Sequence, residues 1–260
     1  MDKRELLNRI AASEDKRLLA GRIWDKWELC QRRKVPAVTG FLSPQEQALA
    51  KRLLRAMGVS SGYLVWGGYD GAERRQLHFL PDWQEEAEDT VRLLRCSFYE
   101  EGALTHRDFL GSLMGLGLTR EKIGDILVTE HSADILVGSS VSDFLLTDWT
   151  AAGRIRLRVT PQDLHCLHIP RQQTKEICDT VPSLRLDCMV AAGFSTSRVK
   201  AAQAIAAGRV QVNWTTCQKS DAAVSEGDVL SVRGLGKCRL ERVGNVTKKG
   251  RVWVTLQRYI

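Results

Sequence analysis

Residues 184–214 restrict the possible folds of this chain most, because helix and strand patterns follow one another there at close spacing. Leu186, Met189 and Val190 have the i, i+3, i+4 spacing of a helix with one apolar face. Gly193 is expected to end this helix as a left-handed C-cap. The helix is too short to be stable alone, so it must pack on the elements that follow.

A second short helix and a strand complete the stretch. Ser197 is a suitable N-cap, Val199 and Ala202 lie on one face, and Gly208 is expected to end the helix. Residues 210–212 (Val-Gln-Val), in which apolar and polar side chains alternate, then predict a strand. The stretch as a whole therefore predicts two packed helices followed by a strand.

The second helix begins with two cations, Arg198 and Lys200. A cation in the first turn of a helix opposes the helix dipole, at a cost of roughly 0.3 to 1 kcal/mol. One interpretation is an anion site, in which free N-terminal amides and both cations bind one phosphate. The alternative is two solvated cations beside a core helix.

The distribution of charge favours the anion site. The formal net charge is +7, and residues 181–260 hold 13 Lys and Arg against 5 Asp and Glu, whereas residues 1–180 hold 25 against 26. The basic excess therefore lies entirely in the C-terminal part of the chain. Such an asymmetry indicates a polyanionic partner, and nucleic acid fits better than a membrane surface because the sequence lacks a basic amphipathic helix.

The same region resembles the RNA-binding domain named for ribosomal protein S4. The resemblance rests on the patterns Arg-Leu-Asp, Ser-Arg-x-Lys-Ala, Ile-x-x-Gly-x-Val-x-Val-Asn and Glu-Gly-Asp-Val-Leu-Ser-Val-Arg-Gly within residues 185–234. Trp214 departs from the pattern, because glycine usually follows Val-Asn. Its ring is available for stacking on a base or for packing.

The sequence predicts an α+β protein with several domains. Residues 1–85 are expected to form helices and a β-hairpin, whose turn contains Gly67, Gly68 and Gly71. Residues 86–160 predict the order β-α-β-β-α-β of a ferredoxin-like, RRM-like domain. The open face of such a sheet binds bases in RNA-recognition domains, although the aromatic-rich RNP signature is missing here. Residues 161–182 are expected to form a linker before the S4-type domain at 183–260.

Several motifs extend the resemblance over nearly the whole chain. Gly-Gly-x-x-Gly-Ala-Glu-Arg at 67–74, His-Arg-Asp-Phe-Leu-Gly at 106–111 and Arg-Glu-Lys-Ile-Gly-Asp-Ile at 120–126 resemble the YlmH family of bacteria, kin of the photosystem II S4-domain proteins. The resemblance implies a ribosome-associated RNA-binding protein, in a family often encoded among cell-division genes. It also suggests a role in ribosome rescue or quality control on stalled large subunits.

The leading hypothesis is a non-enzymatic, cytoplasmic and monomeric protein without a cofactor, which binds rRNA or tRNA on the large ribosomal subunit. A start rich in charged residues and the lack of a long apolar run favour this location over a membrane. The predicted RNA contacts are Arg185, Ser197, Arg198, Lys200, Arg209, Asn213, Trp214, Arg233, Lys237 and Arg239, with Arg74 and Arg75 as secondary candidates.

Two other functional classes stay open at this point. One is a scaffold or assembly factor for cell division or photosystem complexes. The other is an RNA-modifying enzyme, although the sequence has no glycine-rich cofactor loop between a strand and a helix. His165, Cys166, His168 and Cys178 fit no zinc-binding spacing, and seven scattered cysteines without a Cys-x-x-Cys motif predict reduced thiols.

Overall fold

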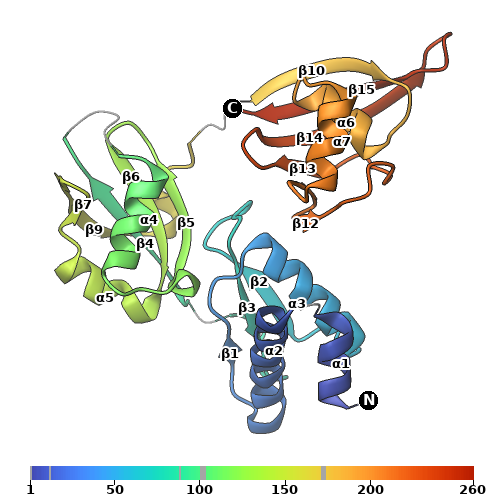
Figure 1. The fold of residues 1–260 in the computed structure, drawn as a ribbon. Helices are drawn as coiled ribbons and strands as arrows, with labels where there is room; N and C mark the ends of the chain where they lie inside the picture. The colour runs from blue at the N-terminus through green and yellow to red at the C-terminus, as the bar shows by residue number, and fades with distance from the viewer. Residues whose placement is uncertain (1, 12, 88, 100–103, 171–173) are drawn as a thin grey trace. The chain divides into compact units, whose positions relative to one another are not determined.

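The computed structural model describes residues 2–11, 13–87, 89–99, 104–170 and 174–260. The chain divides into two compact units, 1–170 and 171–260, each of which combines helices with antiparallel sheets (Figure 1). This α+β class agrees with the sequence prediction. None of the helices in the described part of the chain is long and apolar enough to cross a membrane.

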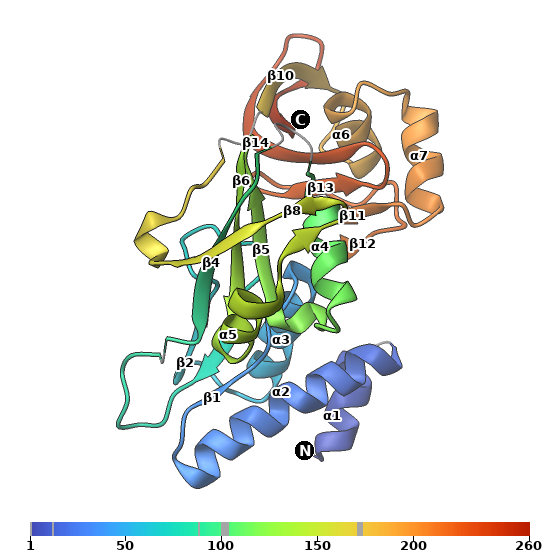
Figure 2. The same ribbon diagram turned by 90° about the vertical axis from the view of Figure 1, so that its left-hand side faces the viewer.

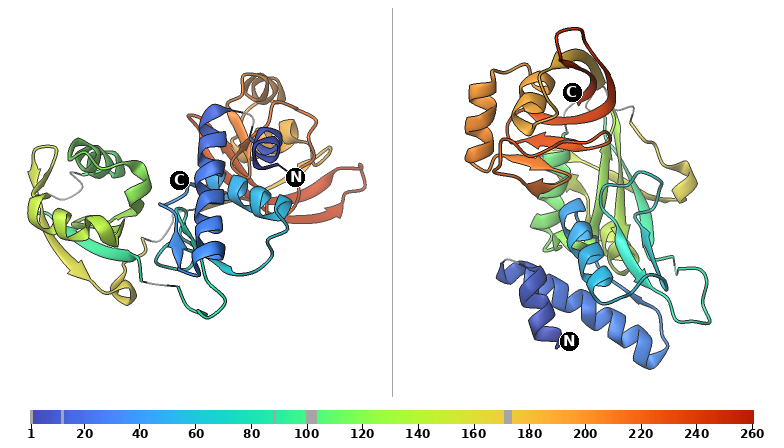
Figure 3. Two further views of the ribbon diagram at one scale, coloured as in Figure 1. Left: turned by 90° about the horizontal axis from the view of Figure 1, so that it is seen from below. Right: turned by 90° about the vertical axis from the view of Figure 1, so that its right-hand side faces the viewer.

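The first part of unit 1–170 contains three helices and a small sheet. Ser13 caps the second helix, and a capping box between Ser43 and Glu46 opens the third. The helices pack on one another and on the buried central strand of the sheet, in the order β1-β3-β2 (Figure 3). The elements are α1 (Lys3–Ile10), α2 (Glu14–Arg33), β1 (Ala37–Val38), α3 (Pro44–Ala56), β2 (Tyr63–Trp66) and β3 (Gln76–Phe79).

The second part of this unit has the predicted ferredoxin-like order. Four antiparallel strands pair in the order β5-β6-β4-β9, and both helices contribute to the core on one face of this sheet. The final strand pairs with β4 over Arg158–Gln162 and so ends two residues past the predicted domain boundary at 160; a separate hairpin precedes it. The elements are β4 (Val91–Ser97), α4 (His106–Gly115), η1 (Arg120–Lys122), β5 (Ile123–Val128), β6 (Ser132–Gly138), α5 (Ser139–Asp148), β7 (Ala151–Ala152), β8 (Ile155–Arg156), β9 (Arg158–Gln162) and η2 (Leu164–Cys166).

Unit 171–260 is a six-stranded sheet, in the order β10-β15-β14-β13-β11-β12, with two helices on one of its faces (Figure 2). The core joins apolar side chains of these helices to alternate residues of the strands. The elements are β10 (Thr174–Val181), α6 (Leu186–Gly193), α7 (Arg198–Ala206), β11 (Val210–Val212), β12 (Thr215–Thr216), β13 (Val229–Val232), β14 (Gly236–Val246) and β15 (Val252–Tyr259).

The predicted linker at 161–182 differs from the structure. Its C-terminal part is strand β10, which pairs with β15 along its whole length. The strand partners are more than 70 residues apart in sequence, Val181 with Val252 being the nearest pair. Only Val181 of this strand is fully buried, so the local sequence lacks the strict alternation by which a half-buried strand is recognised.

Gly193 does not have the predicted C-cap conformation. It lies inside α6, and Ser195 takes the left-handed position instead, with φ 52°. The helix is capped by two hydrogen bonds, from the Ser195 amide to the Ala192 carbonyl and from the Thr196 amide to the Ala191 carbonyl. Glycine is required at 193 for another reason, because a Cβ atom there would lie 2.7 Å from the Cys238 sulfur atom. Gly193 therefore allows α6 to approach β14 closely.

Candidate nucleic-acid interface

The candidate site lies where α6 and α7 begin. Asp187, in the first turn of α6, is buried, and its side chain is only 7% exposed. Its carboxylate accepts hydrogen bonds from Arg198 at 2.7 Å, from Arg185 at 3.2 Å and from the Cys188 amide at 3.0 Å. One buried carboxylate therefore holds two arginines that are separated by a helix and a turn.

Both arginines remain accessible. The side chain of Arg198 is 55% exposed and that of Arg185 is 44% exposed. An arginine has five N–H donors, and each of these pairs uses only one of them on Asp187. The other N–H donors of each guanidinium group are thus free to bind an external anion, while Asp187 fixes the position of the group. We call Arg185, Arg198 and Lys200 the cation site.

The start of α7 adds helix amides to the cation site. The Ser197 side chain accepts from the Lys200 amide at 3.2 Å, which confirms the predicted N-cap. No acidic residue lies in the first turn of this helix. The remaining first-turn amides have no acceptor inside the helix, and they carry the positive end of its dipole. Backbone amides and cations of this kind are the groups that bind phosphate.

The ion pairs also affect the titration of Asp187. Burial acts to raise the pKa of Asp187, but hydrogen bonds from Arg198, Cys188 and Arg185 outweigh burial and lower this pKa below its usual value. The hydrogen bond to Asp187 in turn raises the pKa of Arg198. The ion pair therefore favours the charged forms of both Asp187 and Arg198.

This shift gives a pH-dependent prediction for stability. A lowered carboxylate pKa stabilises the fold fully above the unfolded-state pKa of about 3.9, and the contribution is lost as the pH falls through the lower folded-state pKa. We expect Asp187→Asn to lower the free energy of unfolding by about 1 kcal/mol near pH 7, and by less at about pH 3. Urea unfolding of both proteins at the two pH values measures the difference, and equal differences at both would contradict the prediction.

Asn213 and Trp214 form the turn between β11 and β12, with φ of 47° and 61°. The Asn213 side chain donates to Asp228 at 2.7 Å and accepts from the Val229 amide at 3.0 Å. Both the donor and the acceptor of the Asn213 side chain thus have partners within the domain, and RNA contact by Asn213 stays a prediction. A left-handed tryptophan is strained, by about 1 to 3 kcal/mol, where glycine is usual. Its indole N–H is buried and has no hydrogen-bond partner within the described residues.

The other predicted contacts of this unit do not gather at the cation site. Lys237 and Arg239 alternate along β14 with Cys238 and Leu240, which belong to the core beneath the helices. Their side chains therefore lie on the opposite face of the sheet. Arg239 also pairs with Glu241 at 3.5 Å. The remaining two predicted contacts are exposed cations at the ends of α7 and β13, Arg209 and Arg233.

The secondary candidates Arg74 and Arg75 lie at the end of the glycine-rich loop between β2 and β3. The Arg74 guanidinium donates to three main-chain carbonyls, those of Phe41, Arg120 and Ile123, each at 2.9 Å. Burial lowers the pKa of Arg74. The Nε atom of Arg75 donates to the Ala72 carbonyl at 2.7 Å. These contacts give both arginines a structural role, and RNA contact by either one stays a prediction.

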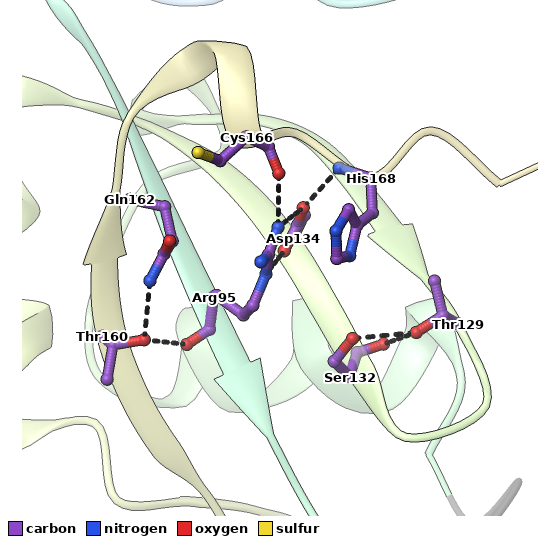
Figure 4. A network of polar contacts seen from close by, with 8 residues as sticks. All are labelled: Arg95, Thr129, Ser132, Asp134, Thr160, Gln162, Cys166 and His168. Atoms are coloured by element: carbon purple, nitrogen blue, oxygen red, sulfur yellow. Dashed lines mark hydrogen bonds and ion pairs between the residues drawn. The ribbon is translucent and has the colours of Figure 1, made fainter.

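The sheet face opposite α4 and α5 is not an open platform. Arg95 and Asp134 form a bidentate ion pair on it, and the segment after β9 covers this pair through the Cys166 carbonyl and the His168 amide (Figure 4). Phe41 packs on the same face beside β4 and β6. The covered part of this face is therefore closed to stacking bases. Among the described residues, no cluster of three or more His, Cys, Asp or Glu side chains has the geometry of a metal site.

Comparison with known proteins agrees with this architecture. Residues 184–230 match the S4 domain, and residues 90–165 match the putative RNA-binding domain in YlmH. The fold and the cation site thus define an S4-domain protein with a second, ferredoxin-like domain. The chain is 35% identical over 224 residues to ribosome-associated protein quality control protein P2 of Bacillus subtilis (strain 168), covering 85% of this chain and 86% of that protein. It therefore belongs to the YlmH family.

A solved structure shows a related fold. The cell division protein ylmH from Streptococcus pneumoniae has a TM-score of 0.51 and 18% sequence identity, and the similarity covers 60% of this chain and 95% of that chain. At this level of identity the similarity concerns the fold alone.

Proposed function

We propose that this protein is a non-enzymatic RNA-binding protein of the ribosome, and that it binds the phosphate backbone of structured rRNA or tRNA through the cation site. The observation that carries the proposal is the buried Asp187 carboxylate, which fixes two exposed arginines beside the N-terminus of α7. Two guanidinium groups, an ammonium group and free helix amides together match the donors that a phosphate requires.

The position of the cations has an energetic consequence. An unrestrained arginine loses up to about 2 kcal/mol of rotamer entropy when it is fixed on a ligand. Asp187 fixes Arg185 and Arg198 before RNA arrives, so less of this entropy is lost on binding. Backbone contacts of this kind position a protein on folded RNA, and base contacts made elsewhere would supply sequence preference.

The ribosomal part of the proposal rests on the Bacillus subtilis relative, which is named as a ribosome-associated quality control protein. We infer that this chain likewise acts in the cytoplasm, as a monomer, on large subunits that carry a stalled peptidyl-tRNA. The uneven charge supports an rRNA or tRNA partner, because the cations needed for a polyanion lie in the domain that bears the cation site.

Arg198→Ala tests the RNA contact directly. The loss of one phosphate contact is expected to weaken binding to purified ribosomes and to reduce the slope of log affinity against log salt by roughly 0.7 to 0.9. The fold should be retained, because Arg185 and the Cys188 amide still bind Asp187 when Arg198 is replaced. Titrations at several salt concentrations measure the slope, with circular dichroism as the check on folding.

Arg33→Ala is the matched control, because Arg33 is an exposed cation at the end of α2, outside both matched domains. It should leave affinity and slope unchanged. Unchanged affinity in Arg198→Ala would show that Arg198 is only a surface residue. Absence of the wild-type protein from ribosomal fractions of sucrose gradients, with no RNA recovered after crosslinking, would reject the proposed function as a whole.

A further inference from the structure

The hairpin formed by β14 and β15 extends past β13 (Figure 1), while β10 pairs with β15 as far as Val252. β13 pairs with β14 only as far as Arg239, whereas β14 continues to Val246. We call residues 242–253, the distal part of this hairpin, the arm. The arm lies beyond the residues that match the S4 domain, which end at 230.

The arm is ordered and carries charge of only one sign. Its tip is closed by hydrogen bonds from the Thr247 amide to the Arg251 carbonyl and from the Gly250 amide to the Thr247 carbonyl. The Arg251 guanidinium donates to the side chain and the carbonyl of Thr180 on β10, which fixes the tip to the neighbouring strand. Residues 242–253 contain four cations and no acid, namely Arg242, Lys248, Lys249 and Arg251.

Two large apolar side chains are exposed beside these cations. Trp253 is 50% exposed and Val246 is 65% exposed. Trp253 lies on the sheet face opposite the helices, because its neighbours Val252 and Val254 pack in the core. Gly244 faces it across the hairpin, where an added Cβ atom would lie 3.1 Å from the Trp253 Cβ atom. No side chain at 244 therefore covers the indole from that side.

The half-exposed Trp253 presents an aromatic ring to solvent, which is available for stacking. Lys248 and Lys249 lie at the tip of the same hairpin and are both exposed. An aromatic ring next to cations is the combination that binds nucleic acid when a base is unstacked, since the ring takes the base and the cations take the flanking phosphates. The lack of any carboxylate in the arm favours RNA over a basic or neutral protein surface.

We propose that the arm is a second RNA contact, which binds an unpaired segment by stacking a base on Trp253 while Lys248 and Lys249 contact the adjacent phosphates. The proposal rests on the proposed function, because it places the arm on an RNA that the cation site also binds. The two surfaces have different tasks. The cation site binds the phosphate backbone of folded RNA, and the arm recognises an unpaired segment.

The experiment compares two RNA probes with the full-length protein. One is a stem–loop with an unpaired loop, and the other is a blunt-ended duplex with the same stem. Trp253→Ala is expected to weaken binding of the stem–loop about five- to tenfold, the lower end of the range for base stacking, and to leave the duplex unaffected. Trp253→Phe should retain most of the affinity, because phenylalanine also stacks.

Two further variants separate stacking from charge and from general surface effects. Lys248→Ala with Lys249→Ala is expected to reduce the salt slope for the stem–loop by roughly 1.4 to 1.8, the value for two phosphate contacts. Leu235→Ala is the matched control, because Leu235 is 43% exposed in the turn between β13 and β14, outside the arm. It should leave both affinities unchanged, and circular dichroism of each variant verifies the fold.

The outcomes distinguish the two proposals. If Arg198→Ala weakens binding but Trp253→Ala binds the stem–loop like the wild type, the arm proposal is wrong and the proposed function stands. If Trp253→Ala binds both RNAs normally but no longer sediments with ribosomes, the arm contacts a protein, which also overturns the proposal. If the wild type binds neither RNA nor ribosomes, both proposals fail.

Discussion

Asp134→Ala is expected to lower the free energy of unfolding of unit 1–170 by about 3 to 5 kcal/mol. The Asp134 side chain is 1% exposed, and its two oxygens bind Arg95 at 2.7 and 2.8 Å. It also accepts from the His168 amide at 2.7 Å. Alanine would leave a guanidinium that is only 17% exposed without its counter-ion, and one main-chain amide without its acceptor.

Urea unfolding followed by tryptophan fluorescence measures this loss. The control is Asp143→Ala, an exposed aspartate on α5, which should change stability by less than about 0.5 kcal/mol. The double variant with Arg95→Ala should recover part of the loss, because it removes the uncompensated charge together with its partner. If Asp134→Ala lowered the free energy of unfolding by less than about 1 kcal/mol, water would be solvating Arg95 at little cost, and the stabilising role given to the ion pair would be wrong.

Asp125→Ala is the second substitution with a large expected effect, a loss of about 3 kcal/mol. The Asp125 carboxylate accepts from the amides of Glu73 and Arg74 at 2.7 and 2.9 Å and from the Tyr69 hydroxyl at 2.9 Å. These three donors belong to the glycine-rich loop between β2 and β3. Without the carboxylate, the loop should separate from β5 far more often than in the wild type.

Hydrogen exchange of the Glu73 and Arg74 amides measures the opening of this loop. Asp70→Ala is the matched control, since Asp70 is an exposed aspartate of the same loop, and it should leave the exchange unchanged. A second measurement follows Tyr69. Burial and then the charge of Asp125 raise the pKa of Tyr69, so this pKa should fall toward its usual value in Asp125→Ala but not in Asp70→Ala. Protected amides together with an unchanged Tyr69 pKa would contradict the role given to Asp125.

Much of the local structure follows from the sequence. Ser43 and Glu46 predict the start of α3, Ser197 predicts the start of α7, and Gly208 has the expected left-handed conformation, with φ 67°. The ferredoxin-like order is also confirmed. These features depend on caps and on apolar periodicity, which act within a few residues of the chain.

The predictions that differ from the structure involve partners far away in sequence. The sequence predicts a linker at β10, since the strand that pairs with it, β15, begins only at Val252. It predicts a C-cap at Gly193, since the contact of Gly193 with Cys238 joins α6 to the distant β14. The sequence analysis does not predict Trp253 as an RNA contact, although a tryptophan next to a basic turn is the signal that points to it.

The amino-acid sequence shows that a basic C-terminal domain begins its second helix with cations, and that its pattern is of the S4 type. The packing of distant segments adds that Asp187 binds both Arg185 and Arg198, and that Arg74 is bound to main-chain carbonyls. The physical reason is the range of the interactions. Caps, dipoles and periodicity are local, whereas the partner of a buried charge depends on which segments pack together.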